Sequence, residues 1–149
     1  MDNSLYTKII LDNARTSPNR KAVEHATHVL EGVNPSCGDD ITLQLRVENG
    51  TIADAGFVGS GCAISQASAS IMVDLIKGQK IEDAERLSGL FLRMIKGEID
   101  EDSEELDDLE DGIALYGIRH TPARVKCAVL SWHTLDEMLQ GKTGTTTGD

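Results

Sequence analysis

The sequence lacks long hydrophobic runs, an excess of basic residues and an even set of cysteines. Its 149 residues carry 14 Lys and Arg against 25 Asp and Glu, which gives a net charge of −11. That is the wrong sign for a protein that neutralises phosphates, so nucleic acid is not expected as a partner. The longest apolar runs span only a few residues, and this excludes a membrane-spanning helix and a membrane partner.

The first five residues lack the basic flank and the continuous apolar stretch of a signal peptide, which predicts a cytoplasmic protein. Cytoplasmic thiols are kept reduced, so the three cysteines, Cys37, Cys62 and Cys127, do not form a disulfide framework. They are instead free thiols, redox-active groups or metal ligands. Three thiols are one short of a four-ligand metal site.

The size and composition predict one globular domain over residues 1–140. Hydrophobic residues make up 40% and charged residues 26% of the chain, which is ordinary for a globular protein and argues against global disorder. Residues 141–149 are rich in Thr and Gly and have nothing to bury. We expect them to form a disordered tail.

The negative charge is concentrated in one segment. Between Glu98 and Asp111, ten of fourteen positions are carboxylates and none is basic, while the rest of the chain has 15 acidic and 14 basic residues. Blocks of like charge are usually solvated, self-repelling loops or frayed helices. The alternative is that this segment is an electrostatic docking face for a partner.

Residue periodicity indicates helices and a small antiparallel sheet. Apolar residues alternate strictly over 41–47, and Asn49-Gly50 is a strong signal for a two-residue hairpin turn. Runs of strands followed by runs of helices are typical of an α+β fold, here with about three strands packed against helices. The expected helices are 4–15, 63–78, 81–96 and 122–139, and the expected extended segments are 26–31, 41–47 and 52–58.

Each cysteine lies where an element begins or ends. Cys37 belongs to a tight loop with Gly38 and Asp39, Cys62 lies where a strand turns into a helix, and Cys127 is in the first turns of the last helix. If they converge, three thiolates and the Asp39 carboxylate make a tetrahedral site suited to zinc or to an iron–sulfur cluster. The alternative is that each cysteine is a small buried hydrophobe.

Other residues that could carry chemistry are weaker candidates. No Lys follows Gly59-Ser60-Gly61 as a P-loop requires, and no local signature supports a cysteine hydrolase that uses Cys62. Trp132 lies on an apolar stripe and is expected in the core. The four histidines are interpreted as surface residues: His25, His28, His120 and His133.

Three ordered motifs resemble those of the U-type iron–sulfur assembly proteins, which comprise IscU, the N-terminal part of NifU, and SufU. The motifs are Asn34-Pro-Ser-Cys-Gly-Asp39, Gly59-Ser-Gly-Cys-Ala-Ile-Ser65 and Arg124-Val-Lys-Cys127, and the likeness extends over about 5–139. The resemblance implies a SufE/NifU-like fold. It also implies that Cys37, Asp39, Cys62 and Cys127 are metal ligands.

Two departures indicate the SufU branch. Lys126 stands where scaffold proteins of the IscU type usually carry His, and 121–125 replaces their Leu-Pro-Pro-Val-Lys motif. A long segment over about 98–118 is similar to the SufU insertion. This branch implies a zinc-dependent sulfurtransferase that works with the cysteine desulfurase SufS and the SUF scaffold complex, with Cys37 as the sulfur acceptor. Arg124 would steady a thiolate or contact the partner, or is a plain surface residue.

Two other functions stay open at this point. The first is a non-enzymatic scaffold on which Cys37, Cys62 and Cys127 build a [2Fe–2S] cluster or hold iron. The second is a structural zinc domain that recruits partners, in which case removal of the metal would unfold the chain.

Overall fold

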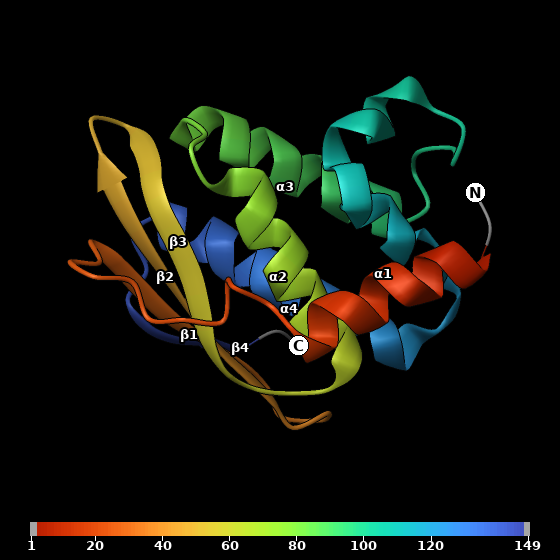
Figure 1. The fold of residues 1–149 in the computed structure, drawn as a ribbon, viewed down its shortest axis with the longest axis horizontal. Coiled ribbons are helices and arrows are strands. Elements are labelled where there is room, and N and C mark those ends of the chain that lie inside the picture. Colours follow the sequence, from red (N-terminus) through yellow and green to blue (C-terminus); the bar gives the residue numbers. More distant parts are fainter. Residues whose placement is uncertain (1–2, 148–149) are drawn as a thin grey trace.

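The computed structural model describes residues 3–147 and has a four-stranded sheet packed with helices (Figure 1). This confirms the expected α+β class. The strands are β1 (His28–Asn34), β2 (Asp39–Glu48), β3 (Thr51–Ser60) and β4 (Gly144–Thr147). The helices are α1 (Asn3–Arg15), α2 (Ala63–Ile76), α3 (Ile81–Ile95), the 3₁₀ segment η1 (Glu104–His120) and α4 (Pro122–Leu139).

The first three strands form an antiparallel meander in the order in which they occur along the chain. Asn49 and Gly50 both have positive φ, 53° and 77°, and they join β2 to β3 as the sequence predicts. Alternate residues of β2 are buried, which places one face of the strand in the core. The antiparallel part of the predicted fold is therefore confirmed, with three strands as expected.

Part of the segment expected to be a disordered tail, residues 141–149, forms a fourth strand. Gly144–Thr147 pairs in parallel with Leu30–Val33 of β1 and makes the sheet mixed. Strand addition needs only unpaired backbone groups at a sheet edge, and Thr is a good strand former even without an apolar face. Thr146 is only 3% exposed, and the Thr145 hydroxyl donates to Glu31 Oε1 at 2.9 Å. Residues 148 and 149 lie outside the described part.

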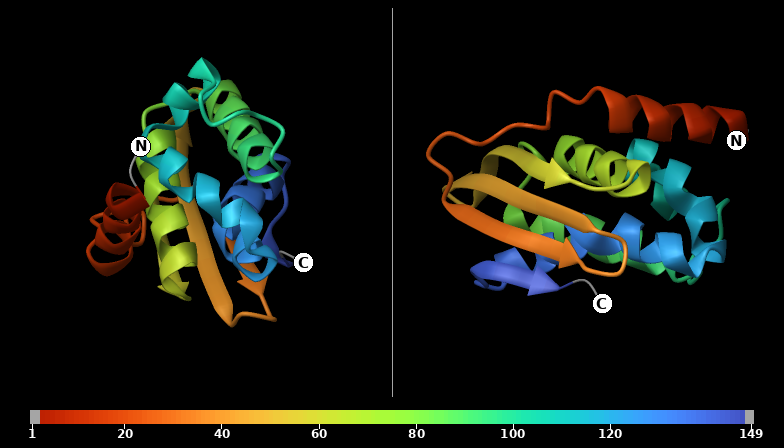
Figure 2. Two further views of the ribbon diagram at one scale, coloured as in Figure 1. Left: turned by 90° about the vertical axis from the view of Figure 1, so that its right-hand side faces the viewer. Right: turned by 90° about the horizontal axis from the view of Figure 1, so that it is seen from below.

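The helices pack against the sheet and against one another. α2 contacts β3, α4 lies against β1 and β2, and α1 lies on the outer side of α2 (Figure 2). Trp132 of α4 is fully buried, as predicted, and its ring stacks on Phe91 of α3 with centroids 4.3 Å apart. Its indole N–H donates to the Ser68 hydroxyl of α2 at 3.0 Å, so one side chain ties three helices together. None of the helices described is long and apolar enough to cross a membrane.

The acidic segment is more ordered than the solvated loop or frayed helix that charge alone predicts. From Glu104 onward it forms η1, and its Leu106 and Leu109 side chains are fully buried in the core against α3 and its neighbours. Arg86 and Arg93 of α3 pair with Asp108 and Glu105 at 3.0 and 3.5 Å. The carboxylates are exposed, as a solvated segment requires, but two leucines at helical spacing hold its second half against the core.

Candidate metal centre

Three parts of the chain that are far apart in sequence meet at one end of the sheet, toward the lower edge of Figure 1. The hairpin of β1 and β2 closes where Asn34 lies opposite Asp39, and β3 ends where Ser60 lies opposite Asp40. The loop that carries Cys37 and the turn that carries Cys62 therefore share this end. The start of α4, with Cys127, completes the group.

The Cys37 loop is a tight turn, as the sequence predicts. The backbone N–H groups of Cys37 and Gly38 both donate to the Asn34 carbonyl, at 3.2 and 3.0 Å. Gly38 has φ of +74°, a conformation that L side chains rarely adopt, so a glycine is favoured between Cys37 and Asp39. As a result the Cys37 thiol is exposed at the tip, whereas Asp39 is fully buried.

Three of the four candidate ligands converge. Cys37, Asp39 and Cys127 each offer a ligand atom, and these atoms lie within 4.8 Å of one another. No other group of three His, Cys, Asp or Glu side chains within residues 3–147 meets that condition. Cys62, the N-cap of α2, is half-buried and not part of this group of three, but its thiol interacts with Cys127.

The cluster changes the acidity of the buried Cys127 thiol. Burial raises the pKa of the Cys127 thiol far above its ordinary value, and hydrogen bonds with Asp39, Cys62 and Cys37 and the charge of Cys62 raise it further. In the metal-free chain this thiol is therefore protonated at neutral pH. A bound divalent cation would reverse the balance, because it favours the thiolate over the thiol.

The Asp39 carboxylate is held from two sides. Its Oδ1 accepts the backbone N–H of Cys62 at 3.0 Å and the Ser65 hydroxyl at 3.1 Å. Its Oδ2 lies 3.5 Å from the Asn34 amide nitrogen, and the Cys127 thiol also interacts with the carboxylate. One oxygen of a buried carboxylate is thus engaged by the protein, and the other retains its capacity to bind a cation.

Sequence reasoning missed three contributors to this site. Asn34 and Ser65 lie inside the recognised motifs, and a small polar residue three positions after Cys62 on a helix was the available signal for Ser65. The third is the Ala123 carbonyl, which accepts from the Cys37 and Cys127 thiols at 3.8 and 3.7 Å. A backbone group of this kind leaves no trace in the sequence.

The remaining candidates lie outside the thiol cluster. Arg124 is exposed and lines a mostly apolar groove of about 380 Å³ that begins next to Cys62 at Ala63. The histidines are not ligands in the convergent group, and His133 lies 3.7 Å from Glu137. The other residues that line the groove are Thr7, Ile10, Leu11, Ile64 and Ile118.

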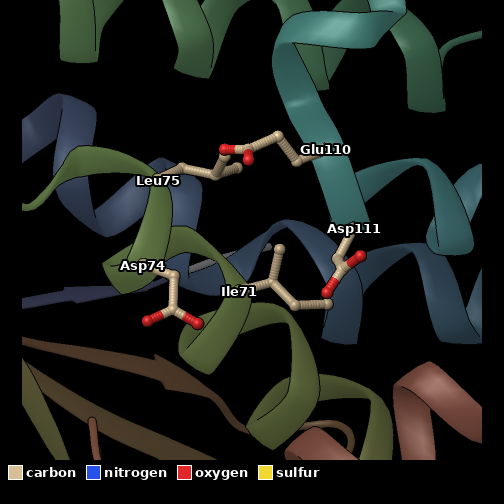
Figure 3. Close-up of a pocket in the computed structure, with 5 residues that line it drawn as sticks. All are labelled: Ile71, Asp74, Leu75, Glu110 and Asp111. Carbon is tan, nitrogen blue, oxygen red and sulfur yellow. The ribbon is translucent and has the colours of Figure 1, made fainter.

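A separate hollow of about 220 Å³ lies between α2 and η1 (Figure 3). Ile71 and Leu75 line it together with the carboxylates of Asp74, Glu110 and Asp111. The Asp74 and Asp111 side chains point in different directions, and Asp74 Oδ1 accepts from the Asn19 amide at 2.8 Å. These carboxylates do not form a convergent ligand set.

Comparison with known proteins agrees with this geometry. The sequence profile described as the NifU-like N-terminal domain matches residues 5–140, which include all four candidate ligands. The chain belongs to the NifU-like N-terminal domain family. The resemblance on which the sequence interpretation depends is confirmed, and the chain is a member of an iron–sulfur cluster assembly family.

Some relatives of this NifU-like chain are named as a sulfurtransferase and others as scaffold proteins. It is 40% identical to the zinc-dependent sulfurtransferase SufU of Bacillus subtilis, over 90% of this chain and 88% of that protein. It is 42% identical to the iron–sulfur cluster assembly scaffold protein IscU of Thermotoga maritima, over 91% and 93%.

A solved structure shares the fold. The crystal structure of a putative iron–sulfur cluster assembly scaffold protein for the SUF system from Fervidobacterium islandicum superposes with a TM-score of 0.82 at 33% identity. The match covers 93% of this chain and 99% of that one.

Proposed function

We propose that this protein is a zinc-dependent sulfurtransferase, with Cys37 as the sulfur acceptor. It would take persulfide sulfur from a cysteine desulfurase of the SufS type and pass it to the SUF assembly machinery in the cytoplasm. The observation that carries the proposal is the contrast in exposure within one cluster. Cys37 is exposed at a loop tip, while Asp39 and Cys127 are 0% and 2% exposed. A partner can reach only the first of these.

The donor set fits zinc. Cys37, Asp39, Cys62 and Cys127 would supply three thiolates and one carboxylate, a combination that zinc accepts in tetrahedral geometry. When bound, the ion keeps the thiols deprotonated and protects them from oxidation. Burial raises the pKa of the Cys127 thiol, so this thiol depends on a nearby cation to become a thiolate.

The transfer step is a thiol–disulfide type of exchange. The Cys37 thiolate attacks the outer sulfur of the desulfurase persulfide and forms a new S–S bond. The S–S bond within the desulfurase persulfide breaks, and its cysteine leaves as a thiolate. No external oxidant or reductant is needed, because the outer sulfur keeps its oxidation state. Cys37 then carries the persulfide, and its position at the loop tip leaves it accessible to the next acceptor.

A scaffold for a [2Fe–2S] cluster is the second candidate, because the relative named as the IscU scaffold is as similar to this chain as SufU is. Lys126 favours the sulfurtransferase. It precedes Cys127 on α4 and is exposed, at the position where IscU-type scaffolds usually place a His. A Lys ammonium has no free lone pair at neutral pH and is not a metal ligand in that state.

The test combines the purified chain with a SufS-type desulfurase and measures cysteine turnover. We expect the wild-type chain to accelerate turnover and to gain one sulfur atom on Cys37 by mass spectrometry. Cys37→Ala should abolish both effects. Glu85→Ala, an exposed change on α3 away from the Cys37 loop (Figure 1), is the control and should retain both. Undiminished acceleration by Cys37→Ala would remove the acceptor role.

Metal analysis separates the remaining alternatives. We expect about one zinc per chain, lost or weakened in Asp39→Ala and in each Cys→Ala variant. Anaerobic formation of a stable, transferable cluster without acceleration of the desulfurase would favour the scaffold. Removal of the metal should leave the fold intact, because the buried helices and sheet already provide a core. Unfolding on metal removal would indicate a structural zinc domain.

A further inference from the structure

We infer that Ser65 is a positioning residue that determines which oxygen of Asp39 faces a bound metal, and that it thereby sets the metal affinity of the site. The inference depends on the proposed function, since it concerns the same ligand set. It assigns a role to a residue that neither ligates the metal nor reacts.

The hydrogen bonds of Asp39 are strongly unequal. Oδ1 accepts two donors, the Cys62 N–H at 3.0 Å and the Ser65 hydroxyl at 3.1 Å, while the Asn34 amide lies at 3.5 Å from Oδ2. The Cys127 thiol, itself a candidate ligand, also interacts with the carboxylate. Asp39 is fully buried and Ser65 is 1% exposed, so water does not replace a lost partner easily. Two donors on one oxygen hold the carboxylate in a single rotation and leave Oδ2 to the cation.

The Ser65 hydroxyl donates its hydrogen bond to the Asp39 carboxylate rather than to a carbonyl of α2. Its hydroxyl lies 3.1 Å from Asp39 Oδ1 and 3.0 Å from the Cys62 carbonyl, but it has a single proton to donate. The charged carboxylate is the stronger acceptor. The Cys62 carbonyl already accepts the Gln66 N–H at 3.1 Å, so the first turn of α2 keeps its hydrogen bond without Ser65.

Gly61 leaves room for the Ser65–Asp39 hydrogen bond, because it has no side chain. A Cβ at Gly61 would lie 2.8 Å from Asp39 Oδ1 and would collide with the Ser65 hydroxyl. Any side chain at position 61 would therefore displace the pair. Because φ at Gly61 is not in the left-handed region, close approach rather than backbone conformation accounts for the glycine.

The experiment measures zinc affinity by competition with a chromophoric chelator, using Zn²⁺ alone and no desulfurase. We expect Ser65→Ala to weaken binding by about 10–100-fold, the usual cost of losing a hydrogen bond to a metal ligand. Co²⁺ provides a second readout, because its absorption bands report the geometry of the ligand set. The matched control is Ser70→Ala on the same helix, whose hydroxyl contacts Asn13 and Ser17 instead of the site.

A double-mutant cycle separates positioning from general structural damage. In the Asp39→Ala background, Ser65→Ala should have no further effect on Zn²⁺ affinity, since the carboxylate it orients is gone. Thermal unfolding of the metal-free variants checks that each one folds. An equal loss in both backgrounds would overturn the inference, as would wild-type affinity and an unchanged Co²⁺ spectrum in Ser65→Ala. If the wild-type chain binds neither ion, the proposed function fails first and the inference falls with it.

Discussion

The acidic segment is held in place by its leucines and not by its charges, and this can be tested by comparing two substitutions. Leu106 is fully buried in the core, while Asp108 lies two residues away and pairs with Arg86 on the surface. We expect Leu106→Ala to destabilise the protein strongly and Asp108→Asn to have little effect.

The magnitudes follow from burial. Truncation of a fully buried leucine costs about 2–5 kcal/mol, from lost transfer free energy and the cavity left behind. The Arg86–Asp108 pair is 3.0 Å long, but its side chains are 55% and 58% exposed. Exposed pairs of this kind contribute about 0–1 kcal/mol, because water and salt screen them. A much larger loss of stability in Leu106→Ala than in Asp108→Asn would show that the leucines and not the ion pairs hold the segment.

Urea unfolding followed by the fluorescence of Trp132, the single tryptophan, gives both free energies. With a slope of about 2 kcal/mol per molar urea, Leu106→Ala should lower the midpoint by about 1–2.5 M. Leu5→Ala on α1 is the matched control, since Leu5 is 45% exposed and its loss should change stability by no more than about 0.5 kcal/mol. A midpoint unchanged by Leu106→Ala would refute the reasoning and restore the solvated loop.

Two further predictions concern pH and charge. Because burial and neighbouring groups raise the pKa of the Cys127 thiol, its proton must leave when a metal binds. Apparent Zn²⁺ affinity should therefore rise with pH between about 6 and 8, by about tenfold per pH unit for each proton released. The slope of affinity against pH should be shallower in Cys127→Ala, and chelator competition at a series of pH values measures it. An affinity that does not change with pH would mean that the thiols are not ligands. If the acidic segment is a docking face, replacing Glu104, Asp107 and Glu110 by their amides should slow association with the desulfurase and flatten its dependence on ionic strength, measured by stopped-flow mixing. Unchanged rates at low salt would leave these carboxylates as a solvated covering.

The sequence by itself determined the local elements and the family. Alternation over 41–47 and the Asn49-Gly50 pair predict the β2–β3 hairpin, because side-chain period and turn preference are properties of neighbouring residues. Helical spacing predicts α2, α3 and α4 to within a few residues for the same reason. Three thiols and Asp39 in motifs of the family indicate a metal site, since ligand type can be read without geometry.

Only the tertiary structure decided what these elements bring together. The convergence of Cys37, Asp39 and Cys127 depends on the register of β1 against β2 and on the docking of α4, which no local pattern contains. β4 arises because the open edge of β1 offers backbone partners to a tail without apolar side chains. The roles of Ser65 and the Ala123 carbonyl follow from contacts between residues far apart in the chain, and such contacts exist only once the chain is folded.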